Sequence, residues 1–210
     1  MKGEVLPKVK YLCIDPSGTG TTGILFFATN TKSKALFSEY KSKKWEEHLN
    51  FIVDLVKEWK PDNIIYENTT FLYGRQHQGT VGLYKLIGGI TALKYIFDFI
   101  QKIDSVAVNQ VKPFKAKLFR GQEQIENLTY QNGRGWKYRQ KKISLHQLDA
   151  LVVYHLWSGG SLESQKSLKK KIVKLRDKKR LGIRQKEQLQ KLEGFLKKKL
   201  NANCIHPERA

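Results

Sequence analysis

The chain has 210 residues, of which 40% are hydrophobic, so it can form one packed domain of about 150 residues and an additional segment. Its formal net charge of +20 indicates a polyanionic partner, most simply nucleic acid, rather than a small-molecule substrate. No apolar run approaches the ~18 residues of a membrane span, and the first residues lack the apolar core of a signal peptide.

The first predicted element is a β-hairpin. An apolar run, Tyr11–Ile14, ends on Asp15, then turn-forming residues follow, and a second apolar run covers Gly23–Ala28. The first strand would bring Asp15 to the rim of a sheet, where a carboxylate needs a partner to offset its desolvation. A cation would serve, although a surface aspartate that begins a turn is the alternative.

A later strand, which follows a predicted helix, also ends on a carboxylate. After a third strand over Ser33–Lys43, apolar residues at helical spacing predict an amphipathic helix over Lys44–Lys60. The short apolar strand Asn63–Asn68 then ends on Glu67. Because open sheets place their sites at the carboxyl ends of parallel strands, two such acids indicate a shared metal site. The alternative for either acid is a helix cap.

The middle of the chain is predicted to alternate between helix, strand and basic loop. A polar loop containing Arg75 precedes a long helix over Gly79–Lys102 and a fifth strand over Ser105–Val111. In Lys112–Gly121, basic residues alternate with aromatic ones, a pattern that suits phosphate contact and base stacking. A solvated basic loop with two buried phenylalanines is the alternative. Residues 122–142 have low apolar content and contain a flexible basic turn around Arg134.

The last helix of the predicted domain covers Ile143–Trp157. Ser144 is a candidate N-cap. His146 and Asp149 are three residues apart and therefore share a helix face near the first turn. Two polar side chains on so apolar a helix are best explained if they face a functional site. In such a site, histidine can bind a metal or act as a base.

The remaining residues form a basic extension. After a linker at Ser158–Ser161, Leu162–Ala210 carries 16 Lys and Arg against 5 Asp and Glu. Apolar residues at helical spacing predict two helices that clamp nucleic acid or pack on a partner helix; a basic solubilising tail is the alternative. The predicted domains are residues 1–158 and 159–210.

Three motifs in this order resemble those of the RuvC-type Holliday junction resolvases. They are Ile14–Gly20 (IDPSGTG), Ile65–Glu67 with Phe71, and His146–Leu151 (HQLDAL), and the resemblance covers about residues 8–158. It implies an α/β, ribonuclease H-like fold, with a five-stranded mixed sheet flanked by helices, followed here by the basic helical C-terminal extension. The Lys-rich composition would suit a phage-type member.

The resemblance also implies an activity and its residues. The chain would be a metal-dependent crossover junction endodeoxyribonuclease that uses Mg²⁺ or Mn²⁺, with two ions in each active site. The metal-binding and catalytic positions would be Asp15, Glu67, His146 and Asp149. The predicted DNA contacts are Phe71 near the junction centre and the basic residues Arg75, Lys112, Lys115, Lys117, Arg120 and Arg134.

The expected partner is branched DNA, a four-way junction, bound by a homodimer whose two sites cut symmetric strands. Cys13 lies in a predicted core strand far along the chain from Cys204, so we expect no disulfide and a cytoplasmic location, near the nucleoid or in a phage-infected cell. Three alternatives remain: another nuclease of this fold (transposon, terminase or RNA-guided type), a non-catalytic DNA-binding module, and a kinase of the actin/hexokinase superfold.

Overall fold

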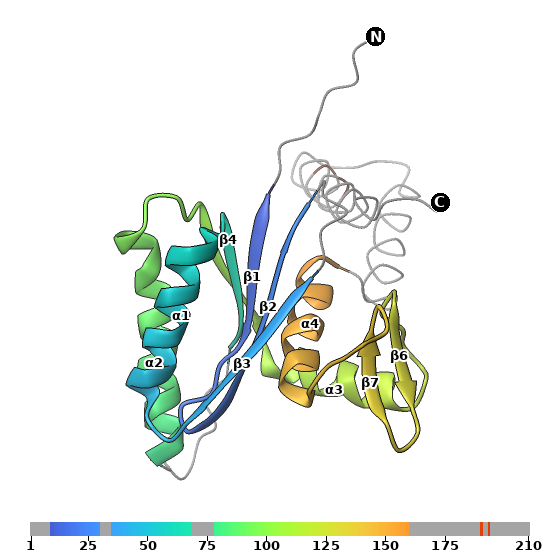
Figure 1. Cartoon of the computed structure of the whole chain (residues 1–210). Helices are drawn as coiled ribbons and strands as arrows, with labels where there is room; N and C mark the ends of the chain where they lie inside the picture. Colours follow the sequence, from blue (N-terminus) through green and yellow to red (C-terminus); the bar gives the residue numbers. More distant parts are fainter. Residues whose placement is uncertain (1–8, 30–34, 69–77, 160–189, 191–192, 194–210) are drawn as a thin grey trace, which may run out of the picture. The chain divides into compact units, whose positions relative to one another are not determined.

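The computed structural model describes residues 9–29, 35–68 and 78–159, together with residues 190 and 193. The contacts divide the chain into two units, Met1–Tyr154 and His155–Ala210, and both sheets belong to the first. The elements are, in chain order, β1 (Lys10–Asp15), β2 (Gly20–Ala28), β3 (Leu36–Ser42), α1 (Trp45–Trp59), β4 (Asn63–Asn68), α2 (Gln78–Ile96), β5 (Lys102–Ala107), α3 (Val108–Phe119), β6 (Leu128–Gln131), β7 (Gly135–Tyr138), β8 (Lys141–Lys142) and α4 (Leu145–Trp157) (Figure 1).

The main sheet has five strands in the order β3-β2-β1-β4-β5. Strand β2 is antiparallel to both β1 and β3, whereas β1, β4 and β5 run parallel. This mixed sheet, with helices packed on it, is the ribonuclease H-like fold that the sequence predicted. The predicted hairpin of the first two strands is confirmed, with Asp15 as the last residue of β1 and paired with Gly23.

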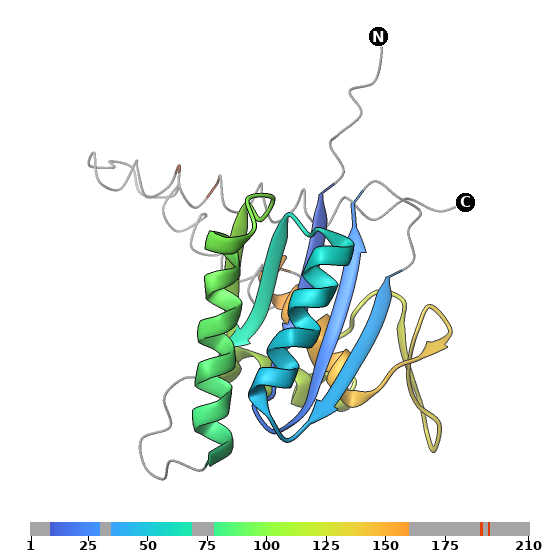
Figure 2. The same ribbon diagram turned by 60° about the vertical axis from the view of Figure 1, so that its left-hand side comes forward.

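Helices α1 and α2 cover one face of this sheet (Figure 2). Alternate residues of the strands, such as Leu12 and Ile14 of β1, point into the buried cluster on this face. From α1 the cluster receives Ile52, Leu55 and Val56, which have the spacing of one helical stripe. Trp45 and Trp59, which frame α1, are partly buried against this core.

Helix α4 packs against the opposite face of the sheet (Figure 1). It begins with a capping box: the Gln147 backbone N–H donates to Ser144 Oγ, and the Ser144 N–H donates to Gln147 Oε1. The N-cap predicted for Ser144 is therefore confirmed. Further along the helix, the Tyr154 ring contacts the rings of Tyr11 and Phe27, which project from this face.

Two predictions for the middle of the chain were wrong. Helix α2 ends at Ile96, whereas the sequence predicted that it would continue to residue 102. The prediction was too long because the next apolar side chains, which pack on the core from a turn, continue the helical spacing in the sequence. Residues 108–119, predicted to be the end of a strand and a basic loop, form helix α3. Its buried residues, Val111, Phe114 and Leu118, are spaced by three and four, a helical stripe that the lysines between them obscured.

Residues 128–142 form a second sheet, where the sequence predicted only a flexible basic turn. Its three antiparallel strands have the order β6-β7-β8. The strands are short, and few apolar residues mark them, which is why the alternation was missed. The Trp136 side chain is buried, and its ring contacts those of Phe119 and Tyr130.

Several predictions fall outside the described residues. They include the loop with Phe71 and Arg75 and nearly all of the predicted basic extension over residues 159–210. Within the described part, Cys13 is buried and free. No helix there has both the length and the apolar character needed to cross a membrane.

Candidate active site

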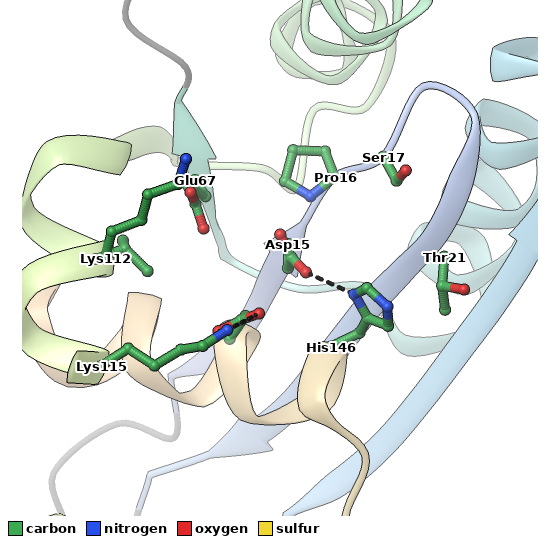
Figure 3. A pocket seen from close by; sticks show the side chains of 10 residues that line it. Asp15, Pro16, Ser17, Thr21, Glu67, Lys112, Lys115 and His146 are labelled. Carbon is green, nitrogen blue, oxygen red and sulfur yellow. Dashed lines mark hydrogen bonds and ion pairs between the residues drawn. The ribbon is translucent and has the colours of Figure 1, made fainter. Parts of the chain in front are cut away.

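The carboxyl ends of β1 and β4 bring two acids together at one edge of the sheet. Ile14 pairs with Tyr66 in the parallel register, and the next residues along the two strands are Asp15 and Glu67. Both acids line a pocket of about 270 Å³ that opens at this edge (Figure 3). The complete lining is Asp15, Pro16, Ser17, Thr21, Glu67, Val111, Lys112, Lys115, His146 and Asp149.

The first turn of α4 brings His146 and Asp149 into the same pocket, and a glycine of the sheet makes this approach possible. A Cβ atom on Gly23 would lie 2.0 Å from the backbone oxygen of His146. Real Cβ atoms do not approach other atoms so closely, so only glycine fits beneath the helix here. Because Gly23 pairs with Asp15, the same contact places His146 directly beside that acid.

Three of these side chains have the geometry of a metal-binding group. Asp15, His146 and Asp149 each offer one ligand atom, and these atoms lie within 4.8 Å of one another. His146 Nδ1 is 3.3 Å from Asp15 Oδ2, and the two side chains point toward one another in Figure 3. Glu67 lines the pocket next to this group but is not part of it.

Lys115 of α3 supplies a positive charge to the same cluster. Its ammonium donates to both carboxylate oxygens of Asp149, at 2.6 Å and 2.7 Å. Both side chains are largely buried, with 29% and 14% of their surfaces exposed. A cation that binds Asp149 must therefore share this carboxylate with Lys115 or displace it.

Burial, neighbouring charges and hydrogen bonds shift the pKa values of the pocket residues. Burial and the neighbouring Asp15 and Asp149 carboxylates raise the pKa of Glu67 to about 7. Burial also raises the pKa of Asp15, although its hydrogen bond with His146 opposes the change. The hydrogen bond with Asp15 raises the pKa of His146.

This donor set fits a divalent cation. Carboxylate oxygens are the ligands that Mg²⁺ and Mn²⁺ prefer, and an imidazole nitrogen is also acceptable to Mn²⁺. A divalent ion among Asp15, His146 and Asp149 would offset the repulsion that raises the pKa of Glu67. The residues that the sequence predicted as metal ligands thus line one pocket, and their oxygen and nitrogen atoms suit a divalent cation.

The other predicted site residues lie in different places. Lys112 is exposed and lines the pocket, and Lys117 is partly buried two residues beyond Lys115 on α3. Arg120 and Arg134 are exposed outside the pocket, after α3 and in the β6–β7 turn. Phe71 and Arg75 lie outside the described residues.

Three residues that line or support the pocket were not predicted from the sequence. Ser17 and Thr21 line the pocket, and Gly23 lets α4 approach the sheet. The available signal was the presence of Gly23 inside β2, because a glycine in a strand marks a close approach of backbone. The pairing of Lys115 with Asp149 had no sequence signal, since 33 residues separate them along the chain.

No protein-family model and no curated protein matches the sequence. Several solved structures are similar to the chain, among them the following three. RuvC of Thermus thermophilus in complex with a Holliday junction substrate is 18% identical, with a TM-score of 0.45 over 69% of this chain and 90% of that one. Another structure of RuvC from Thermus thermophilus is 15% identical, with a TM-score of 0.42 over 72% and 97% of the chains.

The third is the yeast mitochondrial Holliday junction resolvase Ydc2, 15% identical, with a TM-score of 0.44 over 72% of this chain and 78% of that one. The chain resembles the RuvC-type resolvases. The four positions that the sequence motifs predicted for metal binding, Asp15, Glu67, His146 and Asp149, are the acids and the histidine of the pocket.

Proposed function

We propose that this chain is a metal-dependent endonuclease that resolves four-way or other branched DNA junctions by phosphodiester hydrolysis. The observation that carries the proposal is the pocket in which Asp15, His146 and Asp149 present ligand atoms within 4.8 Å of one another, beside Glu67 and two lysines. A cluster of acids with adjacent cations suits a substrate that is a phosphodiester and a reaction that builds negative charge on phosphorus.

The acids and the histidine would hold the divalent ions. Bound Mg²⁺ or Mn²⁺ stabilises charge on the phosphate oxygens and lowers the pKa of water. Asp15, at the end of β1, faces both α4 residues and is the best-placed ligand to be shared between two ions. His146, partly exposed and with a raised pKa, can bind an ion in its neutral form or hold a proton at the edge of the pocket.

The lysines of α3 would contact the phosphate. Lys112 and Lys115 line the pocket from the side opposite His146 (Figure 3). Lys115, which now pairs with Asp149, would donate to a phosphate oxygen if that carboxylate held an ion instead. The protein's own cations would thus orient the scissile phosphate, while the carboxylates hold the ions.

The proposed assembly is a homodimer. A four-way junction presents two equivalent strands related by a two-fold axis, and a two-fold dimer presents two equivalent pockets. Paired nicks at symmetric positions are the expected product, because each protomer carries one complete pocket.

The test is cleavage of end-labelled four-way junction, flap and linear duplex DNA, side by side, with Mg²⁺, Mn²⁺ or EDTA. The proposal expects paired symmetric nicks on the junction that need metal and disappear in Asp15→Asn, while junction binding in EDTA is retained. The matched control is Asp54→Asn, an exposed aspartate of α1, which should cut like the wild type.

Equal cutting of flaps or linear duplex would show a nuclease of another specificity and overturn the junction assignment. Tight binding without metal-dependent cutting would leave a DNA-binding module and overturn the nuclease assignment. Metal-dependent cutting by Asp15→Asn would overturn the assignment of the site.

A further inference from the structure

The three-stranded sheet β6–β8 has two chemically different faces. Because paired residues share a face and the side chains alternate along each strand, one face carries Leu128, Tyr130, Trp136 and Tyr138. These rings contact Phe119 of α3 and Phe37 of β3, so this face is turned toward the rest of the unit. The aromatic contacts anchor the small sheet to the nuclease core.

The opposite face presents a row of polar and basic residues across all three strands. Thr129 of β6 pairs with Lys137 of β7, and Lys137 pairs with Lys142 of β8. Thr129 and Lys142 are exposed, and Lys137 is partly buried. Among the described residues, neither ammonium forms an ion pair with a carboxylate.

The pairing of Lys137 with Lys142 is unfavourable for the sheet alone. Like charges directly opposite on neighbouring strands repel each other, and they destabilise the pair. An anion between or above the two ammonium groups would reverse this contribution. The surrounding segment has the same bias, since residues 120–142 contain six Lys and Arg against two Asp and Glu, of which Glu123 is buried.

From this row we propose that the Thr129–Lys137–Lys142 face binds the phosphate backbone of a duplex arm next to the cleavage site. The inference rests on the proposed function and extends it, since it adds a second contact area outside the pocket. The contact would be to phosphates rather than bases, because the aromatic rings that could stack on bases lie on the other face.

The position of the row along the chain suits this role. The sheet lies between α3, which carries Lys112 and Lys115, and α4, which carries His146. Three residues separate Lys142 from His146, so their Cα atoms, four peptide units apart, lie at most about 14 Å from each other. Each strand of a duplex carries one phosphate per about 3.4 Å of helix axis, so DNA whose backbone enters the pocket has further phosphates within that reach.

The test compares two charge changes in the full-length protein. In Lys137→Gln/Lys142→Gln, two positive charges are removed from the proposed face. In the control, Lys57→Gln/Lys94→Gln, two are removed from exposed positions on α1 and α2. Binding to a four-way junction and to a linear duplex of one arm is measured in EDTA over a series of salt concentrations, so that no cleavage step enters.

For the face variant we expect weaker binding to both DNAs. The slope of log binding constant against log salt concentration should be less steep by about 1 for each lysine that contacts a phosphate. The control should keep the wild-type slope. A face variant with the wild-type affinity and slope overturns the inference. Cleavage by the wild type is measured separately, so a protein that binds DNA through this face without cutting would refute the nuclease proposal and retain this one.

Lys142→Glu separates binding from folding. It replaces the like-charge pair by an opposite-charge pair, so the melting temperature of the DNA-free protein should rise while DNA binding weakens further than in Lys142→Gln. A variant that loses DNA affinity only in proportion to a lower melting temperature would mean that the row has a structural role, and this would overturn the inference.

Discussion

The two faces of the five-stranded sheet are built from the same strands, yet they differ in chemistry. On one face, alternate residues such as Leu12, Ile14 and Ile64 form an apolar core with α1 and α2. On the other, the residues between them include Asp15 and Glu67, and α4 and α3 add His146, Asp149 and Lys115. The first face combines apolar burial with hydrogen-bonded polar groups such as Thr22 and His48, whereas the second holds charges that burial penalises.

From this difference we expect the α1–α2 face to stabilise the protein and the α3–α4 face to carry the proposed active site. The charged cluster is tolerated because rigid elements fix it and because Lys115 offsets part of its charge. A divalent ion would offset more. We therefore expect substitutions on the α1–α2 face to alter stability without a specific loss of activity. Substitutions on the α3–α4 face should alter activity, metal response or pH dependence.

The largest expected effect is that of Gly23→Ala. The new Cβ would lie 2.0 Å from the His146 backbone oxygen, so the start of α4 must move away from the sheet and take His146 and Asp149 with it. We expect a loss of about 3 kcal/mol in unfolding free energy and about a 100-fold loss of cleavage rate, measured by urea denaturation and by single-turnover cleavage.

The matched control is Gly88→Ala on α2, where a Cβ would meet nothing within 4 Å. Alanine is favoured over glycine inside a helix, so this variant should gain about 0.5–1 kcal/mol and cut at the wild-type rate. If Gly23→Ala folds with wild-type stability and cuts normally, the close packing of α4 on β2 is not required for the site.

The second largest effect is expected for Lys115→Met, which removes the cation that binds Asp149. Asp149 would then be a largely buried carboxylate beside other acids, so the metal-free protein should lose about 2 kcal/mol. Lys112→Met, in the same pocket but exposed, should lose less than about 0.5 kcal/mol. Both are measured by urea denaturation in EDTA.

Adding Asp149→Asn to Lys115→Met should recover most of the lost stability, because the uncompensated charge is then gone. Saturating Mn²⁺ should also reduce the loss in Lys115→Met, since the ion supplies the missing positive charge. A loss that is unchanged by either addition would mean that Lys115 stabilises the fold by packing rather than by its charge.

The sequence predicted the charged face better than the second sheet, and the reason is physical. Asp15 and Glu67 each end a short apolar strand, so local composition alone places them at the rim. The capping serine and the spacing of His146 and Asp149 are equally local. Lys115 acts through a residue far along the chain, and strands β6–β8 are held by rings on other elements, so neither has a local signature. A glycine inside a strand indicates a close approach of backbone, but the sequence does not show which segment approaches Gly23.

A smaller effect is expected from Thr22→Val on the α1 side of β2. Thr22 Oγ1 accepts a hydrogen bond from the Ser17 backbone N–H and lies 2.9 Å from Nδ1 of the buried His48, whose Nε2 is 3.1 Å from the Ser42 backbone oxygen. Valine has nearly the same shape but leaves Ser17 N–H and His48 Nδ1 without this partner, which should cost about 1–2 kcal/mol.

The measurement for Thr22→Val is urea denaturation together with cleavage at saturating metal. Thr22→Ser keeps the hydroxyl and should lose less, about 0.5–1 kcal/mol for the missing methyl group. Because Ser17 also lines the pocket, a cleavage defect larger than the stability loss would show that the His48–Thr22 hydrogen bonds position the loop after Asp15 as well as stabilise the fold.

The last effect, similar in size to that of Thr22→Val, concerns pH. The pKa of Glu67 is raised to about 7 by burial and by Asp15 and Asp149, whereas an unfolded chain has the ordinary value near 4.5. Between these values the folded protein binds a proton that the unfolded chain has released, so the unfolding free energy of the metal-free protein should fall as pH rises from about 4.5 to about 7 and level off above that. For this partly exposed group, the loss should be about 1–2 kcal/mol after solvent screening.

Glu67→Gln should remove this loss, and Glu58→Gln, an exposed glutamate on α1, should keep it, when both are unfolded in EDTA at a series of pH values. Mg²⁺ should also remove the loss from the wild type, because an ion among the carboxylates favours the charged form of Glu67. A wild-type pH dependence that neither Glu67→Gln nor metal alters would mean that the acids of the pocket do not interact, and the contrast between the two faces of the sheet would then lose its electrostatic basis.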